Sequence, residues 1–238
     1  MGLHALLQRN AILSWLELNP TPEILIMGGR EKGVREFAEK HEIKVIDVDY
    51  TEHGRPLWRS IFLNAQKEAK YDILCQTNSD IIHFQCLIEA AKVLSSDLED
   101  YVCTGQRYDL DIDFEINWKN EKTVELLHNF IKEKGVLHSY SGCDYFIFPR
   151  SHDWSMMPDL EFGRCGGDTW VNANSVERGV LVNATGNVTL IHQNHEHASD
   201  EEDERNKRFL KPGQFFGCDV ANYFLSGGIQ DLRKVIIT

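Results

Sequence analysis

Segments with a helical spacing of apolar residues alternate with short apolar runs through the first half of the chain. Apolar residues that recur every three or four positions predict amphipathic helices, and brief runs of Ile, Leu and Val predict buried strands. The helical segments are 3–18, 31–41, 57–69 and 84–94. The strand-like runs are 23–27, 44–48, 71–77 and 101–105. Because strand and helix alternate, we expect an α/β fold built on a parallel sheet with right-handed crossovers.

The second half of the chain departs from this repeat. Amphipathic helices are expected at 121–134 and 169–176, and strands within 141–150 and at 181–191. We therefore predict one α/β domain over residues 1–238, with a mainly parallel central sheet and a mixed C-terminal half.

Three small polar residues, Asn78, Ser79 and Asp80, interrupt the apolar run at 71–84. The carboxyl end of a central strand is where ligands bind in open α/β sheets, and a carboxylate there commonly holds a divalent cation against phosphate oxygens. A turn, or an N-cap for a helix that begins near Ile82, accounts for the same residues without a ligand.

Three histidines, at positions 192, 195 and 197, follow an expected strand. Neutral imidazole is a frequent metal ligand. The spacing does not specify zinc, because neither an HExxH pattern nor a cysteine partner is present. Together with Asp80, His192 and His195 form a mixed nitrogen and oxygen set that suits manganese or a similar ion.

Asp168 lies directly after Gly166 and Gly167 and two positions before Trp170. A carboxylate in such a loop beside an indole is typical of a general base next to a stacking platform, which a sugar-handling site requires. The structural alternative is that Asp168 caps the helix at 169–176. The two roles are compatible.

A polar loop at 47–56 precedes the third helical segment. The helix N-terminal amides near Leu57, with Arg55 and Arg59 beside them, are able to receive a phosphate, although a solvated helix start explains them equally well. The glycine pair at 28–29 lacks the GxGxxG spacing, so we interpret it as a strand-to-helix turn.

Asp109, Asp111 and Asp113 alternate along residues 106–113. Alternating acids are also a feature of calcium-binding loops. The glycine and the terminal glutamate of an EF-hand loop are missing here, so no calcium site is expected.

The formal net charge of −12 argues against extensive binding to nucleic acid or anionic membranes, because too few basic residues are present to neutralise many phosphates. An anionic substrate would therefore have to be neutralised by a local positive charge, such as a bound metal ion. No apolar run approaches the roughly 20 residues that cross a bilayer, and the N-terminus lacks the pattern of a signal peptide. We expect a cytoplasmic protein without a transmembrane segment.

Five motifs resemble those of the GT-A-type nucleotide-sugar glycosyltransferases, specifically a group of small bacterial and large-virus members. The motifs are LQRNAILSWLELNPTPEI from Leu7, Asn78-Ser79-Asp80 in place of the usual D-x-D, DYFIFPR from Asp144, Gly166-Gly167-Asp168-Thr169-Trp170, and IHQNH from Ile191. The resemblance covers most of the chain and implies a Rossmann-like three-layer sandwich. It places a nucleotide-sugar-binding half at 1–105 and an acceptor and metal half at 106–238.

The resemblance also implies roles for individual residues. Asp80 binds the metal, Mn²⁺ or Mg²⁺, that bridges the donor diphosphate, and His192 or His195 is the second protein ligand. The donor is a nucleoside-diphosphate sugar, with a UDP-sugar preferred, and the acceptor is a glycan or another hydroxyl compound. Asp168 is the base, and a single base suffices for inversion at the anomeric carbon. The residues expected to bind the donor are Gly28, Arg55, Leu57, Asn78 and Asp80.

Two other functions remain open. In the family, a strand that supplies nucleotide contacts precedes the opening helix, whereas this chain starts at Met1 almost inside that helix, so the first strand is expected to be missing. That departure favours a non-catalytic nucleotide-sugar or glycan-binding relative, while Asp80 and Asp168 favour the enzyme. A nucleotidyltransferase is disfavoured because its Gly-rich, basic phosphate loop is lacking.

Overall fold

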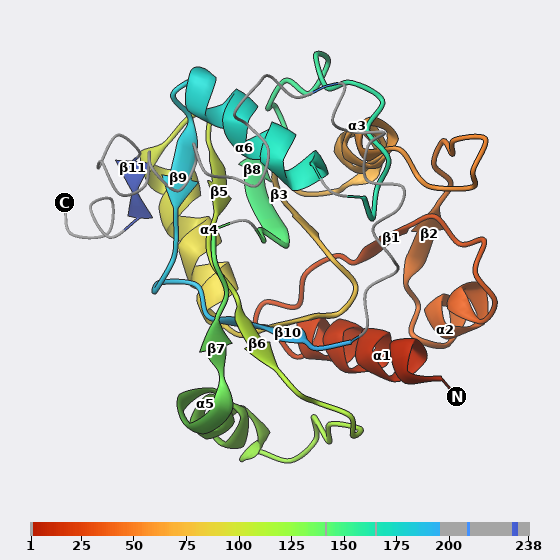
Figure 1. The fold of residues 1–238 in the computed structure, drawn as a ribbon, viewed down its shortest axis with the longest axis vertical. Helices are drawn as coiled ribbons and strands as arrows, with labels where there is room; N and C mark the ends of the chain where they lie inside the picture. Colours follow the sequence, from red (N-terminus) through yellow and green to blue (C-terminus); the bar gives the residue numbers. More distant parts are fainter. Residues whose placement is uncertain (1, 141, 165, 196–208, 210–229, 233–238) are drawn as a thin grey trace.

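The computed structural model describes residues 2–140, 142–164, 166–195, 209 and 230–232, which form six helices and eleven strands (Figure 1). The helices are α1 (Leu3–Leu16), α2 (Val34–Lys40), α3 (Trp58–Glu68), α4 (Cys86–Asp97), α5 (Thr123–Lys134) and α6 (Gly167–Glu177). The first strands are β1 (Leu25–Met27), β2 (Lys44–Ile46), β3 (Ile73–Thr77), β4 (Ile81–His83) and β5 (Val102–Thr104). The later strands are β6 (Tyr108–Leu110), β7 (Val136–Leu137), β8 (Tyr145–Pro149), β9 (Leu181–Asn183), β10 (Leu190–Gln193) and β11 (Gln230–Asp231). Within these described residues, no helix combines the length and apolar character that a transmembrane span needs.

The strands form three sheets. The largest has five strands in the order β11-β9-β5-β8-β3, the second has the order β4-β10-β6-β7, and β1 and β2 form a separate parallel pair. In the largest sheet β8 runs antiparallel to both β3 and β5, whereas β5, β9 and β11 are mutually parallel. The protein is therefore a mixed α/β fold. Of the five strands of the largest sheet, β3, β5, β9 and β11 run in one direction and β8 alone runs in the other, which agrees with the expectation of a mainly parallel central sheet with a mixed C-terminal half.

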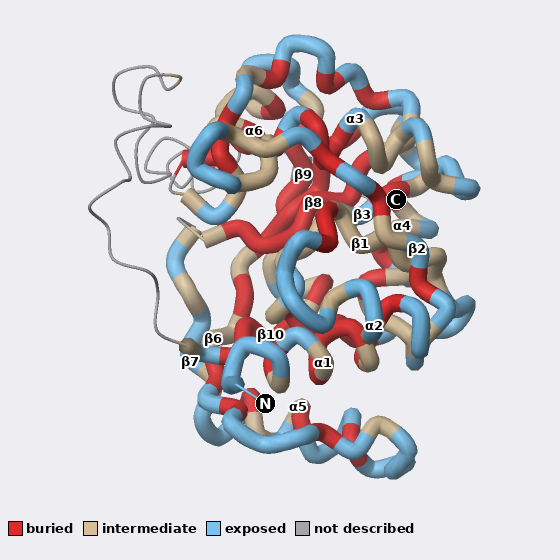
Figure 2. The backbone as a smooth tube through the Cα atoms, turned by 90° about the vertical axis from the view of Figure 1, so that its right-hand side faces the viewer, coloured by how far each residue is buried: buried red, intermediate tan, exposed pale blue. Residues whose placement is uncertain are grey.

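Strand β8 divides the hydrophobic core into two layers. Its side chains alternate between the faces of the sheet, as the pleat requires. Phe146 and Phe148 pack in a cluster that includes Trp58 of α3 and residues of α6, whereas Tyr145 and Ile147 pack in a second cluster with residues of α4. Figure 2 shows buried residues concentrated along β8 and β9. Helices therefore cover both faces of the largest sheet.

Helix α1 covers the edge of the second sheet, where β4 is the outermost strand. An edge strand exposes backbone donors and acceptors that need partners. The indole Nε1 of Trp15 donates to the carbonyl of Ile81 at 2.8 Å, and the backbone N–H of His83 donates to the hydroxyl of Ser14 at 3.2 Å. Side chains of α1 thus replace the hydrogen bonds of a neighbouring strand.

Most expected elements are present within a few residues of their predicted bounds, but two predictions are corrected and two strands were missed. The segment 181–191 contains two strands in different sheets, because the chain turns at Gly186 with φ +85°. No helix begins near Ile82, since β4 occupies 81–83 and α4 starts at Cys86. Strands β6 and β7 were not predicted. Both are short, and their few residues do not establish a period.

Candidate metal centre

The turn at 78–80 joins β3 of the largest sheet to β4 of the second sheet. Asn78 holds it in place. The backbone N–H of Asn78 donates to the carbonyl of Asp144 at 3.0 Å, and its side-chain amide donates to Asp144 Oδ1 at 2.8 Å. Of the two structural alternatives for these residues, the turn is present and the helix N-cap is not. Asp80 therefore lies where the two sheets meet.

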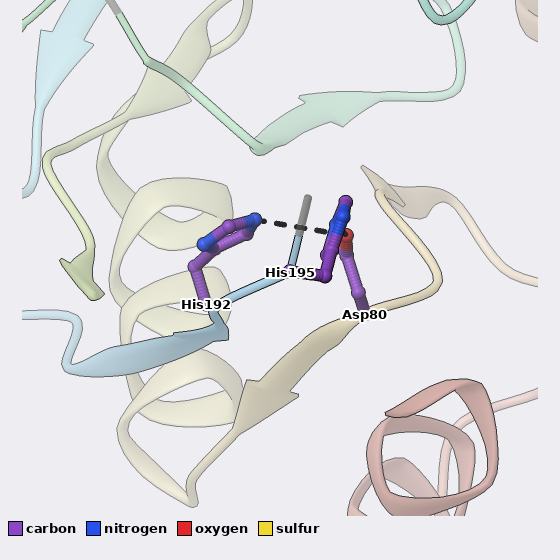
Figure 3. A group of neighbouring side chains, drawn as sticks. All are labelled: Asp80, His192 and His195. Carbon is purple, nitrogen blue, oxygen red and sulfur yellow. Dashed lines mark hydrogen bonds and ion pairs between the residues drawn. The ribbon is translucent and has the colours of Figure 1, made fainter. Parts of the chain in front are cut away.

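The side chains of Asp80, His192 and His195 converge at this turn (Figure 3). Strand β10 pairs antiparallel with β4 and places His192 opposite Ile81, the residue that follows Asp80. Asp80 Oδ2 lies 3.0 Å from His195 Nε2 and 3.7 Å from His192 Nε2. One potential ligand atom from each of the three residues lies within 4.8 Å of the others. Folding thus brings together the three predicted metal ligands.

The chemistry of this metal triad, Asp80, His192 and His195, fits a divalent cation. Asp80 Oδ1 is buried and has no hydrogen-bond partner among the described residues. A buried oxygen in that state costs about 1–3 kcal/mol, which a bound cation would remove. Burial and the nearby charge of Arg107 lower the pKa of His192, outweighing the neighbouring carboxylates. The ring is therefore neutral at pH 7, the form that binds metals.

A buried arginine connects the metal triad to two further carboxylates. Arg107 donates from Nε to Asp109 Oδ1 at 2.9 Å, and a second nitrogen donates to Asp144 Oδ2. His138 Nδ1 contacts the other oxygen of Asp109 at 2.6 Å. Burial would raise the pKa of Asp109, but the hydrogen bonds and charge of His138 and Arg107 lower it. Asp109 and Asp144 thus flank Arg107, whereas Asp80 and Asp109 flank His192.

Asp168 lies in the first turn of α6, where Gly166, at φ +100°, is the N-cap. The capping role expected for Asp168 therefore belongs to Gly166. Asp168 Oδ1 accepts the backbone N–H of Thr169 at 2.8 Å. Burial, reinforced by the negative charge of Asp144, raises the pKa of Asp168 to about 6. Such a carboxylate is ionised at pH 7 yet more basic than a free one, which suits a general base.

Close packing surrounds the start of α6. A Cβ atom at Gly167 would lie 2.3 Å from Nε1 of Trp58, so only glycine fits against that indole. Trp170, the expected stacking platform, is partly buried against the core cluster that contains Trp58. Asp168 is therefore held on a rigid helix start.

The other predicted donor-site residues lie on different elements. Gly28 follows β1, and a Cβ there would lie 2.5 Å from the hydroxyl of Tyr50. The backbone N–H groups of Leu57 and Trp58 already donate to backbone carbonyls at 2.9 Å, so these two amides are not available to a phosphate. Among the described residues, no hydrogen bond or ion pair joins Gly28, Arg55 or Leu57 to the metal triad.

No protein-family model matches the sequence, and no curated protein matches it. The residues themselves therefore carry the functional interpretation. Of the predicted site residues, Asn78, Asp80, His192 and His195 lie in one connected polar neighbourhood, and Asp168 interacts electrostatically with Asp144 in the same region.

Sequence reasoning missed the roles of Arg107, Asp109 and Asp144. The alternation of acids from Asp109 was a usable signal only in part, because β6 (Tyr108–Leu110) contains Asp109 whereas Asp111 and Asp113 follow the strand. In the structure Asp109 belongs to β6, and Asp111 accepts a hydrogen bond from Asn194 at 2.8 Å. The third histidine of the motif, His197, lies outside the described residues.

Proposed function

We propose that the protein is a metal-dependent glycosyltransferase that moves a sugar from a nucleoside-diphosphate sugar to an acceptor hydroxyl. The observation that carries the proposal is the convergence of Asp80, His192 and His195, with one buried carboxylate oxygen open, at the carboxyl end of β3. The mixed α/β fold, with helices on both faces of the largest sheet, is compatible with the GT-A architecture that the motifs suggest.

The proposed mechanism assigns a role to each residue. Asp80, His192 and His195 would hold Mn²⁺ or Mg²⁺, and the ion supplies the positive charge that stabilises a departing nucleoside diphosphate. Asp168 accepts the proton of the acceptor hydroxyl as that oxygen bonds to the anomeric carbon and the bond to the diphosphate breaks. Direct displacement with this one base gives inversion of configuration. A UDP-sugar is the donor we favour.

A second function, non-catalytic binding of a nucleotide sugar or glycan, is favoured by one specific observation. Two of the amides expected near Leu57 to Ser60 to receive phosphate, those of Leu57 and Trp58, are engaged within the protein, and Tyr50 fills the space beside Gly28. A bound donor would then lack the phosphate contacts expected from the amides of Leu57 and Trp58.

Calorimetric titration of UDP, with and without Mn²⁺, tests the donor site in the wild-type protein and in Asp80→Ala. Asp113→Ala is the matched control, because Asp113 is an exposed acid and none of the metal ligands. We expect micromolar binding that requires both Mn²⁺ and Asp80 and that persists in the control. Binding without turnover of a panel of UDP-sugars would favour the non-catalytic function. No binding of UDP, GDP or TDP under either condition would overturn the glycosyltransferase function and the binding of a nucleotide sugar.

A further inference from the structure

His192 lies between two carboxylates, one at each ring nitrogen. Its Nε2 is 3.7 Å from Asp80 Oδ2, and its Nδ1 is 3.3 Å from Asp109 Oδ1. The imidazole is almost entirely buried, with 4% of its side chain exposed, so water does not compete effectively for either nitrogen. The charges of these two carboxylates therefore bias which nitrogen carries the proton of the neutral ring, although neither contact has the geometry of a hydrogen bond in this structure.

The contact with Asp109 is built into the sheet. Strands β6 and β10 are parallel neighbours, and Asp109 is the register partner of His192. Partners on adjacent strands project their side chains on the same face of the sheet. The position of Asp109 beside the ring thus follows from the pairing of the strands and does not depend on a flexible loop.

Asp109 is also held from its other side. Arg107 Nε donates to Oδ1 at 2.9 Å, and His138 Nδ1 contacts Oδ2 at 2.6 Å. Both partners favour the charged form of Asp109, and an ionised carboxylate only accepts hydrogen bonds. The group 3.3 Å from His192 Nδ1 is therefore a negative charge held in a fixed position.

We propose that Asp109 is a positioning residue that holds His192 in the tautomer with its proton on Nδ1, so that the Nε2 lone pair faces the metal site. A neutral imidazole has only one N–H, for which Asp80 and Asp109 compete. Asp109 is the closer of the two, and Asp80 Oδ2 already has His195 Nε2 at 3.0 Å. Carboxylates behind metal-binding histidines orient the ring and raise its basicity. This inference rests on the proposed metal function of the triad.

The tautomer is measured directly by long-range ¹H–¹⁵N correlation of the histidine rings in the metal-free wild-type protein at pH 7.5, with the His192 signals assigned from His192→Gln. We expect Nδ1 to be protonated in the wild type. In Asp109→Asn the carboxylate acceptor is lost, and we expect the proton to move to Nε2, where Asp80 accepts it. Protonated Nε2 in the wild-type protein would overturn the proposal.

Mn²⁺ affinity, measured by calorimetry on the same proteins, is the second readout. We expect Asp109→Asn to weaken Mn²⁺ binding by about 10- to 100-fold, the usual effect of losing such a partner. Asp111→Asn is the control, since Asp111 is exposed, two residues further along, and contacts Asn194. His138→Ala removes only one support of Asp109 from a partly exposed position and should weaken binding less.

The outcomes separate the two proposals. A wild-type protein with protonated Nδ1 that binds Mn²⁺ but no nucleotide contradicts the glycosyltransferase function and leaves the role of Asp109 supported. Equal Mn²⁺ affinity of the wild type and folded Asp109→Asn, verified by circular dichroism, contradicts the role of Asp109 alone.

Discussion

Asn10 and Gln193, which are 183 positions apart in the sequence, share a buried hydrogen bond of 3.0 Å from the amide of Asn10 to the carbonyl oxygen of Gln193. The amide of Gln193 donates to the backbone carbonyls of Asp80 and Leu7 at 2.8 and 2.9 Å. The amide of Asn10 also donates to the carbonyl of Phe114, and its side-chain oxygen accepts the backbone N–H of Ile116, each at 3.0 Å. This closed network ties the Asp80 turn to α1, so two polar residues of the sequence motifs have a structural role.

Gln193→Ala should destabilise the protein by about 2–4 kcal/mol, because it removes the hydrogen bonds that the Gln193 side chain makes with Asn10 and with the carbonyls of Asp80 and Leu7 in a largely buried network. Urea unfolding with and without Mn²⁺ measures the effect. We also expect weaker Mn²⁺ binding, since the backbone of Asp80 loses a hydrogen bond. Gln8→Ala, which removes only an exposed hydrogen bond to Ser79, should change stability by less than about 0.5 kcal/mol. Equal effects of the two substitutions would contradict the network's importance.

Asp168→Asn should stabilise the protein at pH 8 while it abolishes sugar transfer. The pKa of Asp168 is raised to about 6, so the folded state favours the protonated carboxyl group. The stability that this protonated group contributes is lost as the pH rises through about 6. Because the residue is partly exposed, we expect a gain of only about 1–2 kcal/mol at pH 8. The increase in unfolding free energy caused by Asp168→Asn should become smaller toward pH 4. Urea unfolding at pH 4.5, 6 and 8 tests this, with Asp113→Asn as an exposed control. A pH-independent gain would indicate another cause.

His83 should make the protein sensitive to acid. Burial lowers the pKa of its ring to about 3, so the folded state favours the neutral form, and stability is lost as the pH falls from about 6.5 toward 3. The full loss amounts to about 5 kcal/mol. The glutamine of His83→Gln can still reach the Thr77 hydroxyl but does not titrate, so this substitution should flatten the dependence of unfolding free energy on pH. His53→Gln, at an exposed histidine, should leave that dependence unchanged. Identical slopes in the wild type and His83→Gln would refute this assignment.

Gly167→Ala should destabilise the start of α6. The added methyl group would lie 2.3 Å from Nε1 of the buried Trp58, and overpacking of this kind costs about 1–3 kcal/mol. Gly179→Ala is the comparison, because its φ of +71° imposes backbone strain of about 1 kcal/mol while no atom lies within 4 Å. Near-ultraviolet circular dichroism should change only in Gly167→Ala, since only that substitution displaces a tryptophan. An unchanged spectrum would contradict the contact.

Local patterns along the chain were sufficient for the class of fold and for the approximate bounds of most elements. Helical periodicity and short apolar runs depend on neighbouring residues only, so α1, α3 and β3 were predicted close to their observed positions. The same reasoning identified Asp80, His192 and His195, because a polar residue at a strand end is conspicuous against an apolar run. It did not reveal that 181–191 contains strands of two sheets, since both are buried and look alike in sequence.

Only folding determined how these residues are combined. The antiparallel pairing of β10 with β4 brings His192 to Asp80, and its parallel pairing with β6 brings Asp109 to the other side of the ring. Strand register relates residues by hydrogen bonds between distant segments, which no local pattern encodes. The raised pKa of Asp168 has the same origin, because it depends on burial and on Asp144, a residue of another segment. The residues of the candidate metal centre can therefore be found in the sequence, whereas their geometry and protonation belong to the tertiary structure.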